Sequence, residues 1–205
     1  AEVSINNEHG IATLNMMKAL TEHSNPDFLT FNSDATAALW EAGDLALATM
    51  WGSRAGPILD SEGSTEAITS STVVASAPSF AGGSRPSSTL WWDGFAIASN
   101  VSDMDAEASF IAMMNGISSE MVKANNDLTV WLIDGYKAGP TAVGVSETAA
   151  NGAAPYPMLP FMGTLHGAAG AELTDFLQGN ESAEQALSDI EAAYTAAAIE
   201  KGFLN

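Results

Sequence analysis

Two adjacent tryptophans, Trp91 and Trp92, constrain this chain more than any other sequence feature. They follow a turn-rich run at residues 82–87, in which glycine, serine and proline favour loop geometry. They precede a short apolar segment, Phe95–Ala98, that we predict to be a strand. Adjacent side chains of a strand point to opposite faces, so the two indoles cannot both be core residues of one strand face.

The residue that follows the tryptophan pair is Asp93, and the combination has two interpretations. In the functional one, an aromatic face packs on the C–H face of a sugar ring while the carboxylate accepts hydrogen bonds from its hydroxyls. In the structural one, one tryptophan belongs to the core and the other covers a neighbouring loop or helix. The local sequence is equally compatible with both.

A second aromatic segment lies earlier in the chain. Residues 45–50 have the pattern of a short buried strand, which runs into Trp51 and, three residues later, Arg54. Ligands of open α/β sheets bind at the carboxyl ends of the strands, so we interpret Trp51 and Arg54 as candidate ligand-binding residues. The alternatives are that Trp51 caps its strand within the core and that Arg54 forms a surface salt bridge.

Helical periodicity and capping residues predict helices along much of the chain. The first helix is predicted to begin at Asn6 or Asn7, and the second to begin at Ser33 or Asp34 and end at Gly43 as its C-cap. A third begins with a capping box of Ser102 and Asp105. The last begins with a capping box of Ser182 and Gln185 and ends at Gly202. The predicted strands are Leu45–Met50, Thr72–Ala77 and Phe95–Ala98. Alternating helices and strands predict an α/β fold.

The composition excludes several classes of function. The chain has 25 acidic and 6 basic residues, with a net charge of −19, so nucleic acids and anionic lipid surfaces would repel it. It contains no cysteine, and no apolar run approaches the roughly 18–20 residues that span a bilayer. Its three histidines lack ligand spacing, so we expect neither a metal site nor a cofactor.

A catalytic site is equally hard to assemble from these residues. The serine of Gly52-Ser53-Arg54-Ala55-Gly56 falls one place early for a nucleophile elbow. Glycoside hydrolysis requires two carboxylates that flank a cleft, and Asp93 has no evident partner. We therefore expect binding without chemical turnover.

The order of these features resembles the extracellular solute-binding proteins (family 1 type) of ABC importers for sugars and polyols. The similar segments are Ala37–Trp51, Gly82-Gly83 with Leu90–Ser99, Ala106–Phe110 and Gly179–Phe203. Some polyol binders of this family have an arginine shortly after the proline of a Gly-Pro pair, whereas Thr141–Gly144 follows Pro140 here. The resemblance is to the C-terminal half of a family member.

This resemblance implies a periplasmic-binding-protein-like (type II) architecture, in which ligand binds between two α/β lobes. Residues 1–80 and 140–205 would form most of lobe two, and residues 85–135 a strand-and-helix segment of lobe one. The N-terminal part of lobe one would be absent from this chain.

The function implied is that of the substrate-binding component of an ABC importer in the bacterial periplasm. We expect a monomer that binds a sugar or polyol through Trp51, Arg54, Trp91, Trp92 and Asp93, and whose partner is a membrane permease rather than nucleic acid. The alternatives are a carbohydrate-active hydrolase with Asp93 as one acid, or an incomplete lobe that binds no ligand tightly.

Overall fold

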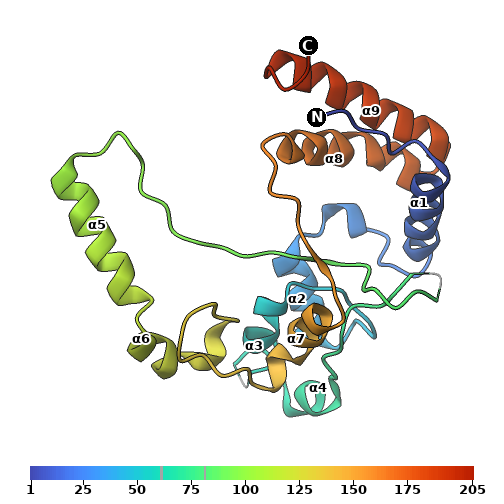
Figure 1. Cartoon of the computed structure of the whole chain (residues 1–205). Coiled ribbons are helices and arrows are strands. Elements are labelled where there is room, and N and C mark those ends of the chain that lie inside the picture. The colour runs from blue at the N-terminus through green and yellow to red at the C-terminus, as the bar shows by residue number, and fades with distance from the viewer. Residues whose placement is uncertain (61, 81) are drawn as a thin grey trace. The chain divides into compact units, whose positions relative to one another are not determined.

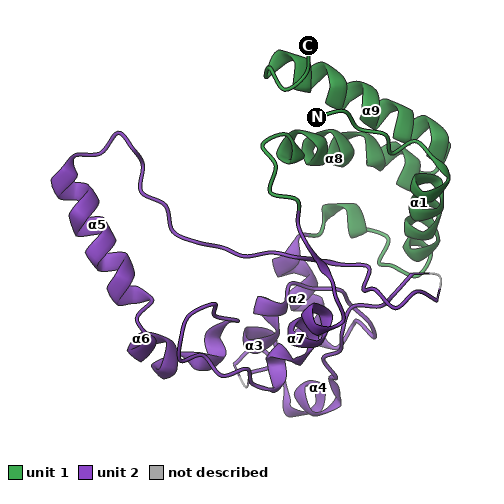
Figure 2. Cartoon of the chain, in the orientation of Figure 1, with its two compact units in different colours: residues 1–31, 157–205 green, residues 32–156 purple. Residues whose placement is uncertain are grey.

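The computed structural model describes residues 1–60, 62–80 and 82–205, and more than half of these residues are helical (Figure 1). The protein has a mixed α/β fold, because a two-stranded parallel sheet accompanies the helices. Unit 1 comprises residues 1–31 and 157–205, and unit 2 comprises residues 32–156 (Figure 2).

Unit 1 is a packed group of helices. Its elements are α1 (Glu8–Thr21), the 3-10 helix η1 (Phe28–Thr30), α8 (Met162–Gln178) and α9 (Ala183–Glu200). The core lies where α9 packs against α1 and α8, and it contains Leu187, Ile190 and Tyr194 from α9. Each large apolar side chain buried in this way contributes about 1.5–3 kcal/mol relative to exposure.

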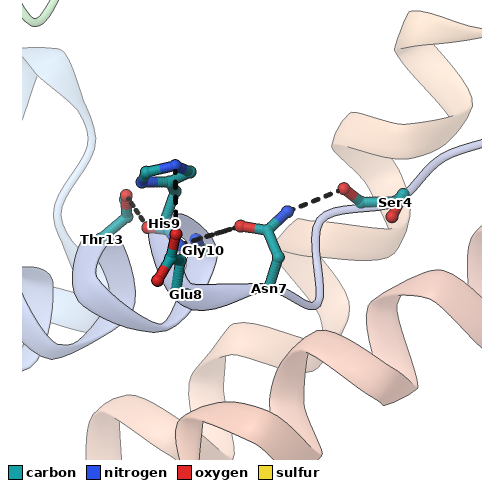
Figure 3. Close-up of polar contacts among 6 residues, drawn as sticks. All are labelled: Ser4, Asn7, Glu8, His9, Gly10 and Thr13. Atoms are coloured by element: carbon teal, nitrogen blue, oxygen red, sulfur yellow. Dashed lines mark hydrogen bonds and ion pairs between the residues drawn. The ribbon is translucent and has the colours of Figure 1, made fainter.

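The N-cap of α1 was predicted to be Asn6 or Asn7, and in the structure it is Asn7. Its Oδ1 accepts hydrogen bonds from the backbone N–H groups of His9 and Gly10 at 2.9 and 3.1 Å. Its Nδ2 donates to the carbonyl oxygen of Ser4 at 3.0 Å (Figure 3). The side chain thus satisfies two helix donors that have no partner within the helix, and it also fixes the segment before it.

Three other helix ends are also as predicted. Ser182 caps α9, because its Oγ accepts a hydrogen bond from the N–H of Gln185 at 3.2 Å. Gly43 and Gly202 have φ angles of 82° and 75° just beyond helices. This left-handed conformation costs glycine little because it has no Cβ, and it lets the last carbonyls of the helix find donors.

Unit 2 contains the remaining elements. They are α2 (Ser33–Ala42), η2 (Gly52–Arg54), α3 (Ala55–Ile58), α4 (Glu66–Ser71), β1 (Thr89–Leu90), α5 (Asp103–Gly116), α6 (Ser119–Ala124), η3 (Asn126–Leu128), η4 (Pro140–Ala142), α7 (Val143–Ala150) and β2 (Ala154–Pro155). Ser102 caps α5 as predicted, and its Oγ accepts a hydrogen bond from the N–H of Asp105 at 3.2 Å.

The prediction of the α2 cap was wrong by one residue. Ser33 and Asp34 both lie inside the first turn, and Asn32 caps the helix by accepting a hydrogen bond from the N–H of Ala35 at 2.9 Å. Asparagine, serine and aspartate are comparable N-caps, so three such residues in a row leave the boundary ambiguous at the sequence level.

The sheet of unit 2 joins two segments that are far apart in the sequence. β1 and β2 run parallel, with Thr89 opposite Ala154 and Leu90 opposite Pro155. Pro155 has no N–H to donate, and the next residue, Tyr156, donates its N–H to the carbonyl oxygen of Leu90 at 2.9 Å. The β1–β2 pairing therefore ends directly before Trp91 and Tyr156.

The three strands predicted from local pattern are wrong. Leu45–Met50, Thr72–Ala77 and Phe95–Ala98 are irregular segments, and within the described residues none of them enters a ladder. Side chains expected in a sheet core lie in solvent: Leu47 is 90% exposed and Val73 is 85% exposed. A strand is stabilised by its neighbours, so an apolar or β-branched run without a partner segment stays irregular.

The two units do not follow the boundaries of the expected lobes. Unit 1 takes residues 1–31 from the first expected range and residues 157–205 from the last, whereas residues 85–135 share unit 2 with residues 32–80 and 140–156. The assignment of these ranges to two lobes, like the periplasmic-binding-protein-like architecture, stays a prediction.

Candidate functional site

Three aromatic side chains of unit 2 meet at the ends of separate segments. Trp51 immediately precedes η2, Trp91 immediately follows β1, and Tyr156 immediately follows β2. We call Trp51, Trp91 and Tyr156 the aromatic group. The parallel pairing of β1 with β2 brings Trp91 and Tyr156 together, since equivalent positions of paired strands lie side by side.

The geometry of the aromatic group is that of two distinct ring contacts. Trp91 stacks on Tyr156 with ring centroids 3.9 Å apart and an interplanar angle of 26°. Trp51 meets Trp91 edge to face, at 5.9 Å and 86°. Offset stacks and edge-to-face pairs are the favourable arrangements of aromatic rings, and each contributes about 0.5–1.5 kcal/mol beyond its buried area.

Both indoles of the aromatic group nevertheless remain accessible. Trp51 is 53% exposed and Trp91 is 41% exposed, whereas Tyr156 is half-buried. Neither tryptophan is thus a core residue of unit 2. Exposed aromatic surface is the kind of surface on which the C–H face of a sugar ring packs.

Trp92 and Asp93 lie beside the aromatic group in sequence but outside its ring contacts. Trp92 is 59% exposed and lies over Gly94, where a Cβ atom would come within 2.9 Å of the indole Cζ3. Asp93 is exposed. The two adjacent tryptophans therefore have different neighbours, as the alternation of side chains along an extended segment requires.

Arg54 is engaged in an ion pair rather than in the aromatic group. Its Nη1 lies 2.7 Å from Oδ1 of Asp34, and the two side chains are 44% and 72% exposed. At such exposure, solvent screens the pair and its net contribution is small. Because the Arg54 side chain is 44% exposed and the guanidinium carries five N–H donors, it can still donate hydrogen bonds to a ligand.

The structure brings together two of the five predicted ligand-binding residues, Trp51 and Trp91. Sequence reasoning missed Tyr156, which lies in a stretch with weak periodicity. The only local signal was its position between Pro155 and Pro157, since flanking prolines favour an extended backbone. Nothing in that signal identifies Trp91 as its partner.

Other surface features of unit 2 involve different residues. One hollow is lined by Met114, Ile117, Ser118, Ser119, Leu132, Ile133 and Asp134, and another by Leu59, Thr69, Thr72, Val73, Val74, Pro140 and Thr141.

Across the described ranges, no three His, Asp or Glu side chains are grouped so that they could hold a metal ion. No helix among those residues combines the length and apolar character needed to cross a membrane.

Neither a protein-family model nor a curated protein sequence matches this chain.

Proposed function

We propose that the protein binds a sugar or polyol through the five residues Trp51, Arg54, Trp91, Trp92 and Asp93. The observation that supports the proposal is the exposed, preorganised pair of indoles, Trp51 and Trp91, held at 5.9 Å by ring contacts. Rings that are already fixed lose little conformational freedom when a ligand packs on them.

Each candidate residue has a specific role in this proposal. Trp51 offers its indole face to the apolar side of the sugar ring, and so does one of Trp91 and Trp92; the three side chains are 53%, 41% and 59% exposed. Arg54 donates hydrogen bonds to ligand hydroxyls, and the carboxylate of Asp93 accepts them. These groups recognise hydroxyls without a nucleophile or a paired acid, so no turnover is expected.

The biological role we propose is delivery of this ligand to an ABC importer, as the periplasmic substrate-binding component. Binding would favour a closed conformation that a membrane permease recognises, because a ligand stabilises the state in which it makes more contacts. This proposed role in import rests on the resemblance of segments such as Ala37–Trp51 to the solute-binding proteins of ABC importers.

Calorimetric titration of the chain with D-glucose, maltose and D-mannitol tests the binding proposal. Wild type should bind at least one of them, and Trp51→Ala and Trp92→Ala should each weaken that affinity by about tenfold or more, the loss of a well-packed aromatic anchor. Leu132→Ala is the control, since Leu132 is 75% exposed in the same unit and lies outside the proposed surface.

Two results would overturn the proposal. One is the absence of binding by wild type, and the other is an unchanged affinity in both tryptophan variants. Hydrolysis of nitrophenyl glycosides that Asp93→Asn abolishes would instead support the hydrolase alternative.

A further inference from the structure

We infer that Tyr156 is a positioning residue, which fixes the ring of Trp91 and through it the orientation of Trp51 at the ligand surface. The inference rests on the proposed function, and it adds a residue that does not itself need to touch the ligand. Its basis is the chain of two ring contacts, in which Trp91 has Tyr156 on one side and Trp51 on the other.

The backbone places Tyr156 where it can act in this way. The N–H of Tyr156 donates a hydrogen bond to the carbonyl oxygen of Leu90 at 2.9 Å. Leu90 directly precedes Trp91, so the backbones of Tyr156 and Trp91 are held next to each other. The register of Leu90 with Pro155 then sets the offset between the two rings. A hydrogen-bonded backbone under both residues leaves the rings little freedom except rotation of their side chains.

The stack restricts that remaining rotation for Trp91. With centroids 3.9 Å apart and planes 26° from parallel, Tyr156 covers a face of the indole. Trp91 is accordingly less exposed than its neighbour Trp92, at 41% against 59%. A Trp91 ring that left the stack would also lose the edge contact with Trp51, so removal of the Tyr156 ring would loosen both indoles.

Two variants separate the stacking role from others. Tyr156→Leu removes the aromatic ring but keeps an apolar side chain, so that unit 2 keeps most of its packing. Tyr156→Phe keeps the ring and removes only the hydroxyl. Helical circular dichroism and cooperative thermal unfolding of both variants show that they fold.

The first readout is the indole N–H resonance of Trp91 in a nitrogen–proton NMR spectrum, assigned by its absence in Trp91→Phe. The ring current of a stacked aromatic displaces this resonance. Tyr156→Phe should keep it near its wild-type position, and Tyr156→Leu should shift it. This readout needs no ligand, so it reports ring geometry whether or not a carbohydrate binds.

The second readout is affinity for whichever of D-glucose, maltose and D-mannitol wild type binds most tightly. Tyr156→Leu should weaken it by about threefold to tenfold, the equivalent of one lost aromatic contact, and Tyr156→Phe should leave it within about twofold. An unshifted resonance or an unchanged affinity in folded Tyr156→Leu would overturn the inference. So would a Tyr156→Phe variant that loses affinity with the resonance in place, because the hydroxyl would then carry the effect.

Failure of the proposed function gives a different pattern. In that case wild type binds none of the three carbohydrates, although the Trp91 resonance still responds to Tyr156→Leu. The role of Tyr156 in ligand binding would fall with the proposal, while the stack itself would stand as a structural contact of unit 2.

Discussion

The carboxylate of Glu191 in α9 accepts a hydrogen bond from the backbone N–H of Ile5 at 2.6 Å. The same oxygen accepts a second one from the N–H of Asn6 at 2.8 Å. These donors belong to the segment that leads into α1, and they have no helical partner of their own. One side chain of α9 therefore fixes the approach to α1 within unit 1.

Replacement of Glu191 by alanine should destabilise unit 1 by about 1.5–3 kcal/mol, because hydrogen bonds to a charged acceptor are stronger than neutral ones. Urea-induced unfolding measures the change. Glu200→Ala is the matched control on the same helix, where an exposed glutamate at the C-terminal end should change stability by no more than about 0.5 kcal/mol. Equal losses in the two variants would contradict the assigned role of Glu191.

Two isoleucines of α9 allow a test of where the core of unit 1 lies. Ile190 is 2% exposed and Ile199 is 51% exposed. Ile190→Ala should cost about 2–5 kcal/mol, the usual range for truncation of a buried isoleucine to alanine. Ile199→Ala should cost less than about 1 kcal/mol, since alanine's better helix propensity offsets part of the lost contact. Chemical denaturation of both variants measures the loss in free energy of unfolding. Similar losses in the two variants would mean that the core of unit 1 is misassigned.

Features that depend on neighbouring residues alone could be predicted from the sequence. The cap at Asn7 and the glycine stop at Gly43 were among them, because a cap is set by one side chain and the adjacent backbone. Features that need a distant partner were not. Leu45–Met50 has a strand-like pattern, but a pattern cannot supply the neighbouring strand.

The candidate site divides in the same way. Trp51 and Trp91 were singled out from their local surroundings, whereas Tyr156 was missed because only the β1–β2 pairing brings it to Trp91.

Helix α5 gives a related lesson. Its apolar spacing predicted the helix correctly, yet Phe110 is 56% exposed in it, since periodicity marks an apolar face without specifying what covers that face.

The ion pair of Arg54 with Asp34 should contribute little to stability. Asp34→Asn is expected to lower the free energy of unfolding of unit 2 by at most about 1 kcal/mol at low salt, because both side chains are well exposed. The difference from wild type should shrink at high ionic strength, where screening weakens the attraction. Thermal or urea unfolding at two salt concentrations measures it. A loss that is large and independent of salt would indicate a different role for Asp34.

Glu181, between α8 and α9, should make unit 1 less stable as the pH rises. Partial burial of its carboxyl, followed by the negative charges of Asp189, Asp175 and Glu172, raises its pKa above the usual value of 4.5. A carboxyl whose pKa is raised by folding imposes no penalty below its unfolded pKa, where both states are protonated. The penalty develops as the pH increases through the unfolded and then the folded pKa.

Glu181→Gln removes this ionisation, so the variant should unfold at a higher temperature than wild type at pH 7. As the pH falls well below 4.5 the two melting temperatures should converge, since the Glu181 carboxyl is then protonated in both folded and unfolded chains. Added salt should narrow the difference at neutral pH, because it screens the three neighbouring carboxylates. Calorimetric melting curves across this pH range provide the measurement, with Glu200→Gln as the control for loss of a glutamate charge elsewhere in unit 1. A variant that melts at or below the wild-type temperature at neutral pH would show that the Glu181 carboxylate is stabilised by its surroundings instead.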